Sequence, residues 1–311
     1  MMEKNQKITL TDRTQLNLNV WMPNEGEAKG ILQVIHGMGD HSLRYTAIGE
    51  YFSSKGYVVV ADDHRGHGNS VSEDGELGHL NRGDSHNLVH DEYEVSQWIK
   101  DRHPHLPLYV LGHSMGSFIL RAYLKSYGDT IAGAIICGSS APDLLRGWLG
   151  MIIAKFRRLK DHGYRRDKFL NTMAFTNYNS KYENVKTDFD WICSDPEVVE
   201  QYIKDPYCGT LPTSGFFHEL SQLVTLISKK GTVKSYPSHL PIMIIGGADD
   251  PLGEHGKGLP RLKQFLQNNG VRNVTLKLYD GGRHEILNEV FKEAVYQDVY
   301  TWITDLNKRN E

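Results

Sequence analysis

An α/β fold with a mostly parallel central sheet, flanking helices and a helical insertion is the fold class that this sequence predicts. Short apolar runs rich in β-branched residues alternate with longer helical patterns along most of the chain. One long segment interrupts the alternation, which then resumes. At 311 residues the chain could hold one large domain or two small ones. Because strands on both sides of the interruption follow the same pattern, we expect them to share one sheet.

The predicted strands fall into two groups. The first group is continuously apolar, as strands covered on both faces are, and occupies residues 31–37, 57–64, 108–114 and 131–140. The second group resumes the pattern near the C-terminus, at 241–250 and 274–282. Helical patterns occupy 44–55, 84–102 and 116–127, and an amphipathic pattern at 288–306 closes the chain. An earlier strand is also expected near the N-terminus.

The interrupting segment, residues 142–236, is expected to be a helical cap. It is rich in Tyr, Phe, Lys, Arg and Asp and contains no convincing buried strand. Residues 1–141 and 237–311 would then form the core domain. Ligands of open α/β sheets bind beyond the carboxyl ends of the strands. A segment inserted between two strand ends is therefore expected to cover that crevice.

Composition excludes several classes of protein. A net charge of −3 argues against a nucleic-acid-binding protein, which would normally be basic. The N-terminal residues lack the apolar core of a signal peptide, and no apolar stretch approaches the length of a membrane span. Cys137, Cys193 and Cys208 are too few and too scattered to predict a disulfide framework or a zinc knuckle. We therefore expect a cytoplasmic protein with reduced thiols.

A G-x-S-x-G motif spans residues 112–116, with Ser114 at its centre. A buried strand is predicted before it and a helix after it, which is the context of a nucleophile elbow. On so sharp a turn the serine backbone is strained, and the glycines on either side prevent clashes with the sheet and the helix. The N-terminus of the following helix would favour negative charge at the reacting centre. Ser114 is therefore the predicted nucleophile.

A serine nucleophile needs a base, and proteins with this elbow carry serine, acid and histidine in that order along the chain. The histidines that follow the serine are His162, His218, His239, His255 and His284. Only His284 lies in a glycine-rich loop directly after a predicted strand, at the sheet edge where the serine also lies. We therefore predict that His284 is the base.

The acid is expected at the end of the preceding strand, where two candidates stand side by side. Asp249 and Asp250 both fit the spacing. Asp250 directly precedes Pro251, and an Asp-Pro pair commonly closes this loop. Asp250 is the preferred candidate and Asp249 is the alternative. The other possibility is that either aspartate only caps a turn.

Two backbone N–H groups must stabilise the oxyanion of the tetrahedral intermediate. One is expected from Met115, which follows the nucleophile. The other is expected from Met38, in the flexible turn after the strand at 31–37. His36 and His113 flank the same centre and are expected to make local hydrogen bonds.

Taken together, these segments resemble the monoacylglycerol lipase and lysophospholipase branch of the α/β-hydrolases, within the serine aminopeptidase S33-like family. The resemblance is carried by HGMGDHSLRY (36–45), DDHRGHGNS (62–70), GHSMG (112–116), GGADDP (246–251) and YDGGRHEILNE (279–289). Asp40 stands where the family usually has glutamate. Counted from the proline that opens the acid strand, the family's catalytic aspartate falls on Asp250. The cap has no such close correspondence.

The resemblance implies hydrolysis of a single acyl chain from a glycerol-like alcohol by way of an acyl-enzyme, with no metal or cofactor. Ser114 would attack, His284 would take and return the proton, and Asp250 would orient the imidazolium. The expected partner is a small lipid or ester substrate and no nucleic acid.

Other activities of this fold are left open by the sequence. A short-chain carboxylesterase or thioesterase would differ only in pocket depth. A prolyl aminopeptidase would need an acidic site in the cap, where the candidate residues are Glu183, Glu197, Glu200 and Glu219. A non-catalytic ligand-binding relative would usually lack a member of the triad. A dehalogenase is excluded, because it needs an aspartate nucleophile in place of Ser114.

Residues 143–160 predict an amphipathic helix in the cap. Its apolar stripe consists of Leu144, Leu145, Trp148, Leu149, Ile152, Ile153 and Phe156. In one interpretation the stripe packs on the core and lines an acyl pocket, with Trp148, Leu149 and Ile152 at the substrate. In the other, the helix is a lid that makes transient contact with a membrane surface.

Overall fold

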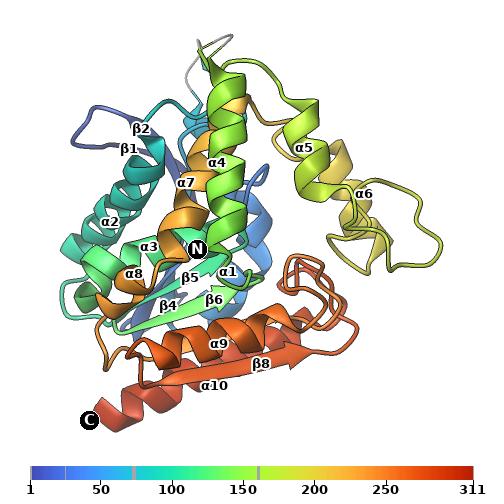
Figure 1. Cartoon of the computed structure of the whole chain (residues 1–311). Helices are drawn as coiled ribbons and strands as arrows, with labels where there is room; N and C mark the ends of the chain where they lie inside the picture. The colour runs from blue at the N-terminus through green and yellow to red at the C-terminus, as the bar shows by residue number, and fades with distance from the viewer. Residues whose placement is uncertain (1, 25, 72–74, 160–161, 311) are drawn as a thin grey trace.

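A single sheet of eight strands organises the molecule (Figure 1). The computed structural model describes residues 2–24, 26–71, 75–159 and 162–310. The strands are β1 (Met2–Thr9), β2 (Gln15–Trp21), β3 (Gly30–Ile35), β4 (Tyr57–Asp63), β5 (Leu108–His113), β6 (Gly133–Cys137), β7 (Ile242–Gly247) and β8 (Val274–Tyr279). Their order across the sheet is β1-β2-β4-β3-β5-β6-β7-β8. The pairs β1–β2 and β2–β4 are antiparallel and the others are parallel, which confirms the predicted sheet.

Helices cover both faces of the sheet. These are α1 (Thr46–Ser54), α2 (Asp84–Arg102), α3 (Met115–Tyr127), α9 (Gly258–Asn268) and α10 (Lys292–Asn310), and the short 3-10 helices are Ser42–Tyr45, Gly68–Ser70 and Gly128–Thr130. In β3, Leu32 and Val34 join the apolar cluster that contains α1 and α10, whereas Ile31 and Ile35 join the cluster of α2, α3 and α9. Both faces of the strand are thus buried, which explains the continuously apolar run in the sequence.

Among the described residues, five helices lie between β6 and β7 in the chain, within the segment expected to be a cap. They are α4 (Leu144–Arg158), α5 (Lys168–Phe175), α6 (Pro196–Lys204), α7 (Ser214–Ile227) and α8 (Lys230–Lys234). Figure 1 shows α5 and α6 projecting to one side, while α7 and α8 lie by α3. Phe216, Leu223 and Ile227 of α7 belong to the same apolar cluster as α3. The last part of the insertion is therefore packed on the core.

Helix α4 packs on α7 through its small residues. Its N-terminus is capped by Asp143, whose carboxylate accepts a hydrogen bond from Arg146 N. A Cβ atom added to Gly147 would lie 2.8 Å from Thr225 Oγ1, and one added to Gly150 would lie 2.9 Å from Ser221 Oγ. Helices that approach so closely require glycine at the contact.

The expectation that the whole apolar stripe of α4 packs on the core is therefore wrong. Trp148 is 50 % exposed and Phe156 is 67 % exposed, and Leu144 and Leu145 are exposed as well. The face of α4 that carries Gly147 and Gly150, the glycine face, packs against α7. These large side chains therefore point toward solvent. Lys160, the last residue of the predicted helix, lies outside the described residues. No described helix is both long enough and apolar enough to cross a membrane.

Candidate active site

The turn between β5 and α3 holds Ser114 in a strained conformation, with φ 54° and ψ −119°. The surrounding glycines are required by the backbone itself. A Cβ atom at Gly112 would lie 2.4 Å from Gly116 O, and one at Gly116 would lie 2.1 Å from Ile35 O. Any larger residue would push the strand and the helix apart. The sequence therefore forms this turn only with small residues on both sides of the serine.

Three side chains predicted from the sequence lie in one hydrogen-bonded chain. Ser114 Oγ is 2.9 Å from His284 Nε2, and His284 Nδ1 is 3.0 Å from Asp250 Oδ2. The second oxygen of Asp250 accepts a hydrogen bond from Leu252 N at 2.8 Å. Asp250 is buried, whereas its neighbour Asp249 is exposed. The structure thus brings Ser114, His284 and Asp250 together and leaves the Asp249 side chain outside the group.

The surroundings of His284 favour its protonated form. Burial alone would lower the pKa of the imidazole, but the charge of Asp250 and the hydrogen bond to it raise that pKa above its ordinary value. The nearby carboxylates of Glu285 and Asp40 act in the same direction. An imidazolium formed during proton transfer would therefore be stabilised in place.

Two backbone N–H groups beside Ser114 are available to an oxyanion. Within the described part of the chain, neither Met38 N nor Met115 N donates a hydrogen bond to another residue, and both residues line the same cavity. A Cβ at Gly37 would lie 3.2 Å from Ser114 Cβ, so the loop that carries Met38 passes close to the serine. The Asp40 carboxylate accepts hydrogen bonds from Gly37 N at 3.3 Å and from His41 N at 2.8 Å, and so fixes this loop.

A buried polar network around Asp40 connects the loop that carries Met38 to the loop that carries His284. The sequence alone did not predict a role for this network. Tyr45 OH donates to Asp40 at 2.8 Å. Arg44 contacts Asp40 and makes two bonds to Glu285, at 2.7 and 2.6 Å. Burial alone would raise the pKa of Asp40, but Arg44 holds it below its usual range. The segments D-H-S-L-R-Y and R-H-E were the only sequence signal of this network.

The two flanking histidines take local positions. His113 lies 3.0 Å from Tyr45 OH through Nδ1 and 3.3 Å from His284 O through Nε2. Burial, helped by the neighbouring His284, lowers the pKa of His113 to about 4, so this ring is neutral at pH 7. His36 stacks on His64 with 3.7 Å between ring centroids and accepts a hydrogen bond from His64 N. Neither ring contacts Ser114 Oγ by a hydrogen bond.

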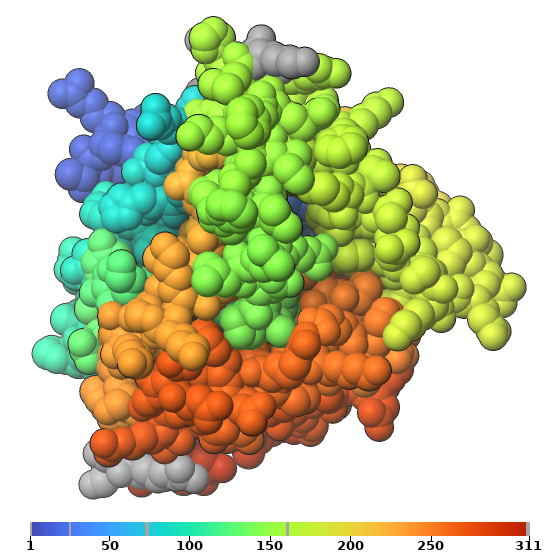
Figure 2. Space-filling model, viewed as in Figure 1, coloured from blue at the N-terminus to red at the C-terminus, as the bar shows by residue number. Residues whose placement is uncertain are grey.

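A cavity of about 740 Å³ opens onto Ser114 and His284. It lies under α4 and α5, and Figure 2 shows a hollow between these two helices. Much of its wall is apolar, formed by Phe118, Leu149, Ile153, Leu170, Phe175, Trp191, Phe217, Leu220 and Val224. Of the three pocket residues predicted on α4, Leu149 lines the cavity, whereas Trp148 and Ile152 do not. The packing of the glycine face on α7 rotates these two side chains away.

The inserted segment, residues 142–236, is bonded directly to the loop that carries His284. Glu285 N donates to Ile192 O at 2.7 Å. The buried Glu289 accepts hydrogen bonds from Ser194 N at 2.9 Å and from Arg283 N at 3.0 Å. The position of the histidine loop therefore depends on a part of the inserted segment that is 95 residues away in the sequence.

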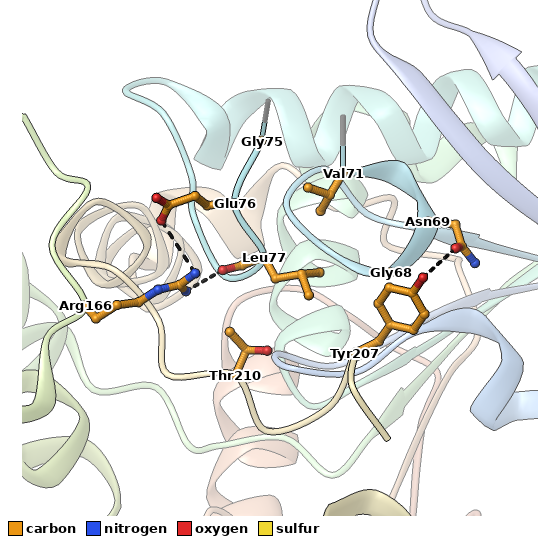
Figure 3. Close-up of a pocket in the computed structure, with 9 residues that line it drawn as sticks. All are labelled: Gly68, Asn69, Val71, Gly75, Glu76, Leu77, Arg166, Tyr207 and Thr210. Carbon is orange, nitrogen blue, oxygen red and sulfur yellow. Dashed lines mark hydrogen bonds and ion pairs between the residues drawn. The ribbon is translucent and has the colours of Figure 1, made fainter. Parts of the chain in front are cut away.

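A second hollow of about 610 Å³ lies on another part of the surface (Figure 3). Tyr207 OH donates to Asn69 Oδ1 at 3.0 Å across it, and Arg166 pairs with Glu76 at 3.5 Å. No serine, cysteine or histidine is among the described residues that line it. Because the hydrogen-bonded series Ser114–His284–Asp250 lies at the wall of the other cavity, we take that cavity as the candidate active site.

Comparison with known proteins identifies the family. A model of the family described as serine aminopeptidase, S33 (Hydrolase_4) matches residues 26–290. The chain belongs to this S33 family. Among its relatives, the monoacylglycerol lipase of Mycolicibacterium smegmatis is 30 % identical over 289 residues, which are 92 % of this chain and 91 % of that protein. Human monoglyceride lipase is 25 % identical over 302 residues, covering 94 % and 88 % of the two chains.

Solved structures share the fold of this chain. A highly thermostable carboxyl esterase from Bacillus coagulans, in complex with glycerol, superposes with a TM-score of 0.91 at 28 % identity and covers 98 % of both chains. Monoglyceride lipase from Saccharomyces cerevisiae, at 20 % identity, has a TM-score of 0.76 over 98 % of this chain and 95 % of that one, which supports the fold. The fold and family expected from the motifs are confirmed.

Proposed function

We propose that this chain hydrolyses carboxylic esters of lipids that carry a single acyl chain, such as monoacylglycerols or lysophospholipids. The observation that carries the proposal is the hydrogen-bonded series Ser114–His284–Asp250 at the wall of a largely apolar cavity. The lipase relatives match along nearly the whole chain, which supports the same substrate class.

In the proposed mechanism Ser114 Oγ attacks the ester carbonyl while His284 Nε2 takes the hydroxyl proton. The N–H groups of Met38 and Met115 stabilise the oxyanion, and loss of one such donor costs about 3 kcal/mol of transition-state stabilisation. His284 then returns the proton to the departing alcohol, leaving an acyl-enzyme. A water molecule, deprotonated by His284, attacks the acyl-enzyme, and His284 returns that proton to Ser114 Oγ as the fatty acid leaves. Asp250 holds the imidazole in its tautomer throughout.

The cavity supports a long acyl chain in preference to a short one. Its walls are built from leucine, isoleucine, valine and aromatic side chains of α3, α4, α5 and α7. Each buried methylene group contributes about 0.8 kcal/mol to binding. We therefore expect turnover of dilute substrate to increase with chain length until the cavity is filled.

A short-chain carboxylesterase is the second candidate. The observation in its favour is the similarity to the carboxyl esterase from Bacillus coagulans, at a TM-score of 0.91. None of Glu183, Glu197, Glu200 and Glu219, the residues considered for a prolyl aminopeptidase, lines the cavity, although Asp143 and Asp188 of the inserted segment do. Glu219 is buried and paired with Arg158 at 3.1 Å.

A panel of esters tests the proposal. Purified enzyme is incubated with monoacylglycerols of increasing chain length, lysophosphatidylcholine, short p-nitrophenyl esters and an aminoacyl naphthylamide, with Ser114→Ala as the control. Fastest release from long-chain monoacylglycerol or lysophospholipid, lost in Ser114→Ala, supports the proposal. Preference for acetate or butyrate esters would assign the carboxylesterase instead. Full activity in Ser114→Ala would remove the nucleophile assignment.

We also propose that α4 makes transient contact with lipid surfaces. Its exposed apolar side chains, Leu144, Leu145, Trp148 and Phe156, lie on the helix that borders the cavity. Substrate could then pass from a lipid surface into the cavity with little exposure to water.

In flotation with anionic liposomes, the double variant Trp148→Ser and Phe156→Ser is expected to lose binding. Val290→Ser, at an exposed apolar residue outside α4, is the matched control. Unchanged flotation of the double variant would reject the contact.

A further inference from the structure

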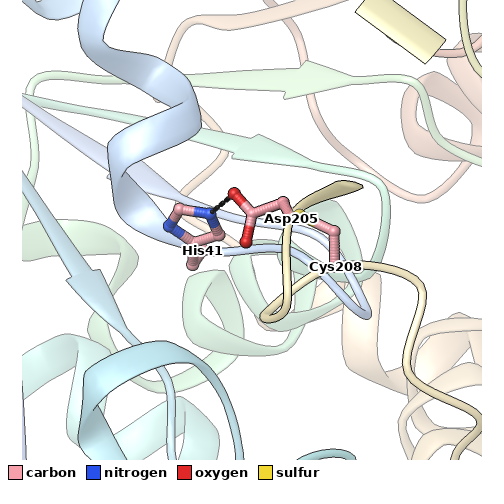
Figure 4. A group of neighbouring side chains, drawn as sticks. All are labelled: His41, Asp205 and Cys208. Carbon is pink, nitrogen blue, oxygen red and sulfur yellow. Dashed lines mark hydrogen bonds and ion pairs between the residues drawn. The ribbon is translucent and has the colours of Figure 1, made fainter. Parts of the chain in front are cut away.

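Three potential metal ligands meet outside the proposed triad, beside the loop after β3 that carries Met38 and Gly39, which we call the oxyanion loop. His41, Asp205 and Cys208 each offer one ligand atom, and these atoms lie within 4.8 Å of one another. His41 Nε2 is 2.9 Å from Asp205 Oδ2. Figure 4 shows the Asp205 carboxylate pointing at the His41 ring, with Cys208 on the same turn as the aspartate. The side chains come from the core domain and from the segment after α6.

The local backbone holds these ligands on one side of a tight turn. Cys208 N donates to Asp205 O at 3.1 Å, and the Asp205 carboxylate accepts a hydrogen bond from Tyr207 N at 2.9 Å. The same segment contacts the oxyanion loop, since Gly209 N donates to Gly39 O at 3.0 Å. The cluster therefore lies where the cap segment meets the loop that carries Met38.

The surrounding charge favours a cation. The negative charges of three carboxylates, those of Asp40, Asp205 and Glu285, interact electrostatically with Cys208. Among the described residues with the strongest electrostatic interaction, Arg44 is the single cation. A divalent ion would add positive charge beside these carboxylates, and its binding would release the proton of the cysteine ligand.

We propose that His41, Asp205 and Cys208 form a zinc-binding site that joins the cap to the oxyanion loop. One imidazole nitrogen, one carboxylate oxygen and one thiolate sulfur are zinc ligands, and water would complete the tetrahedron. On binding, the sulfur–zinc bond forms and the thiol proton leaves to solvent. Zinc–ligand distances of about 2.0–2.3 Å place tetrahedral ligand atoms roughly 3.3–3.8 Å apart. Small side-chain rotations from the present separations close the site.

The cluster at His41 is more exposed than the other candidate cluster of the described residues. The Asp205 side chain is 28 % exposed. The other cluster, Asp62, His64 and Glu92, is fully buried, and His64 Nδ1 already lies 3.0 Å from each of the two carboxylates. We therefore assign zinc to the cluster at His41.

Cobalt spectroscopy tests the ligand set. Metal-free enzyme is titrated with Co²⁺, which produces a sulfur-to-cobalt absorption band when a cysteine coordinates it, and Zn²⁺ is then added in competition with a chromophoric chelator. The wild-type protein and Cys193→Ser are expected to show the band, and Cys208→Ser is expected to lack it. Zinc affinity should fall more than tenfold in Cys208→Ser and in Asp205→Asn. Absence of the band in the wild type, or equal zinc affinity in wild type and Cys208→Ser, would overturn the proposal.

A second measurement tests the connection between cap and loop without using activity. Zinc is expected to raise the thermal denaturation temperature of the wild type and of Cys193→Ser, because the ion binds only the folded protein. The shift should be absent in Cys208→Ser, and its presence there would contradict the site. Ser114→Ala should bind zinc as the wild type does, so the result does not depend on the proposed ester hydrolysis.

Discussion

Two adjacent aspartates show how strongly the role of a single residue depends on its surroundings. Asp250 is buried and bonded to His284, whereas Asp249 is exposed. We expect Asp250→Asn to lower kcat by about four orders of magnitude, because the imidazole loses its orienting carboxylate. Asp249→Asn is the matched control and should stay within a few-fold of wild type. Equal losses in the two variants, measured with one p-nitrophenyl ester, would contradict the assignment.

The pH dependence of activity is also determined by a single residue, His284. Because Asp250 raises the pKa of His284, the acidic limb of kcat/KM should lie above the ordinary histidine pKa of about 6.5. Activity rises as His284 loses its proton. The stability that the raised pKa contributes is complete below about pH 6.5 and is lost as the pH rises through the folded-state pKa.

The residual activity of Asp250→Asn provides the check on this prediction. Burial would then be opposed only by the weaker attraction of Glu285 and Asp40, so the pKa of His284 should fall and the acidic limb should move to lower pH. A limb at the same pH in both proteins would show that another group controls the titration.

At the scale of secondary-structure elements, the contact between α4 and α7 depends on glycine. Gly147→Val would place side-chain atoms against Thr225, and overpacking of this kind costs about 1–3 kcal/mol of the free energy of unfolding. Trp148→Ser, on the exposed side of the same helix, should change that free energy by less than about 0.5 kcal/mol. Urea denaturation of both variants measures the difference. A larger loss in Trp148→Ser would mean that the exposed stripe packs in solution.

At the scale of the whole molecule, one buried ion pair connects the oxyanion loop region to the histidine loop. Arg44 and Glu285 are 241 residues apart in the sequence and make two hydrogen bonds. Glu285→Gln leaves the buried guanidinium without this partner and should cost about 3 kcal/mol of the free energy of unfolding. The exposed pair Lys204–Glu200 is the control, and Glu200→Gln should leave the denaturation midpoint unchanged. Similar midpoints for the two variants would refute the role of the buried pair.

Much of the fold and the proposed triad could be predicted, because their signals are local. Continuously apolar runs predicted the parallel strands, and the glycines around Ser114 are required by contacts within one turn. The sequence did not predict which face of α4 packs, because the helix has both an apolar stripe and a glycine face. Helical periodicity describes each face but not the partner that each one meets.

By itself, the sequence determined the alternation of strands and helices, the strained turn at Ser114 and the chain order of serine, acid and histidine. These depend on side-chain periodicity and on steric contacts between near neighbours. Only the tertiary structure decided that Asp250 and not Asp249 contacts His284, and that Arg44 pairs with Glu285. It also placed His41 beside Asp205 and Cys208. The physical reason is that these contacts join distant segments, whose proximity arises from the packing of the whole chain.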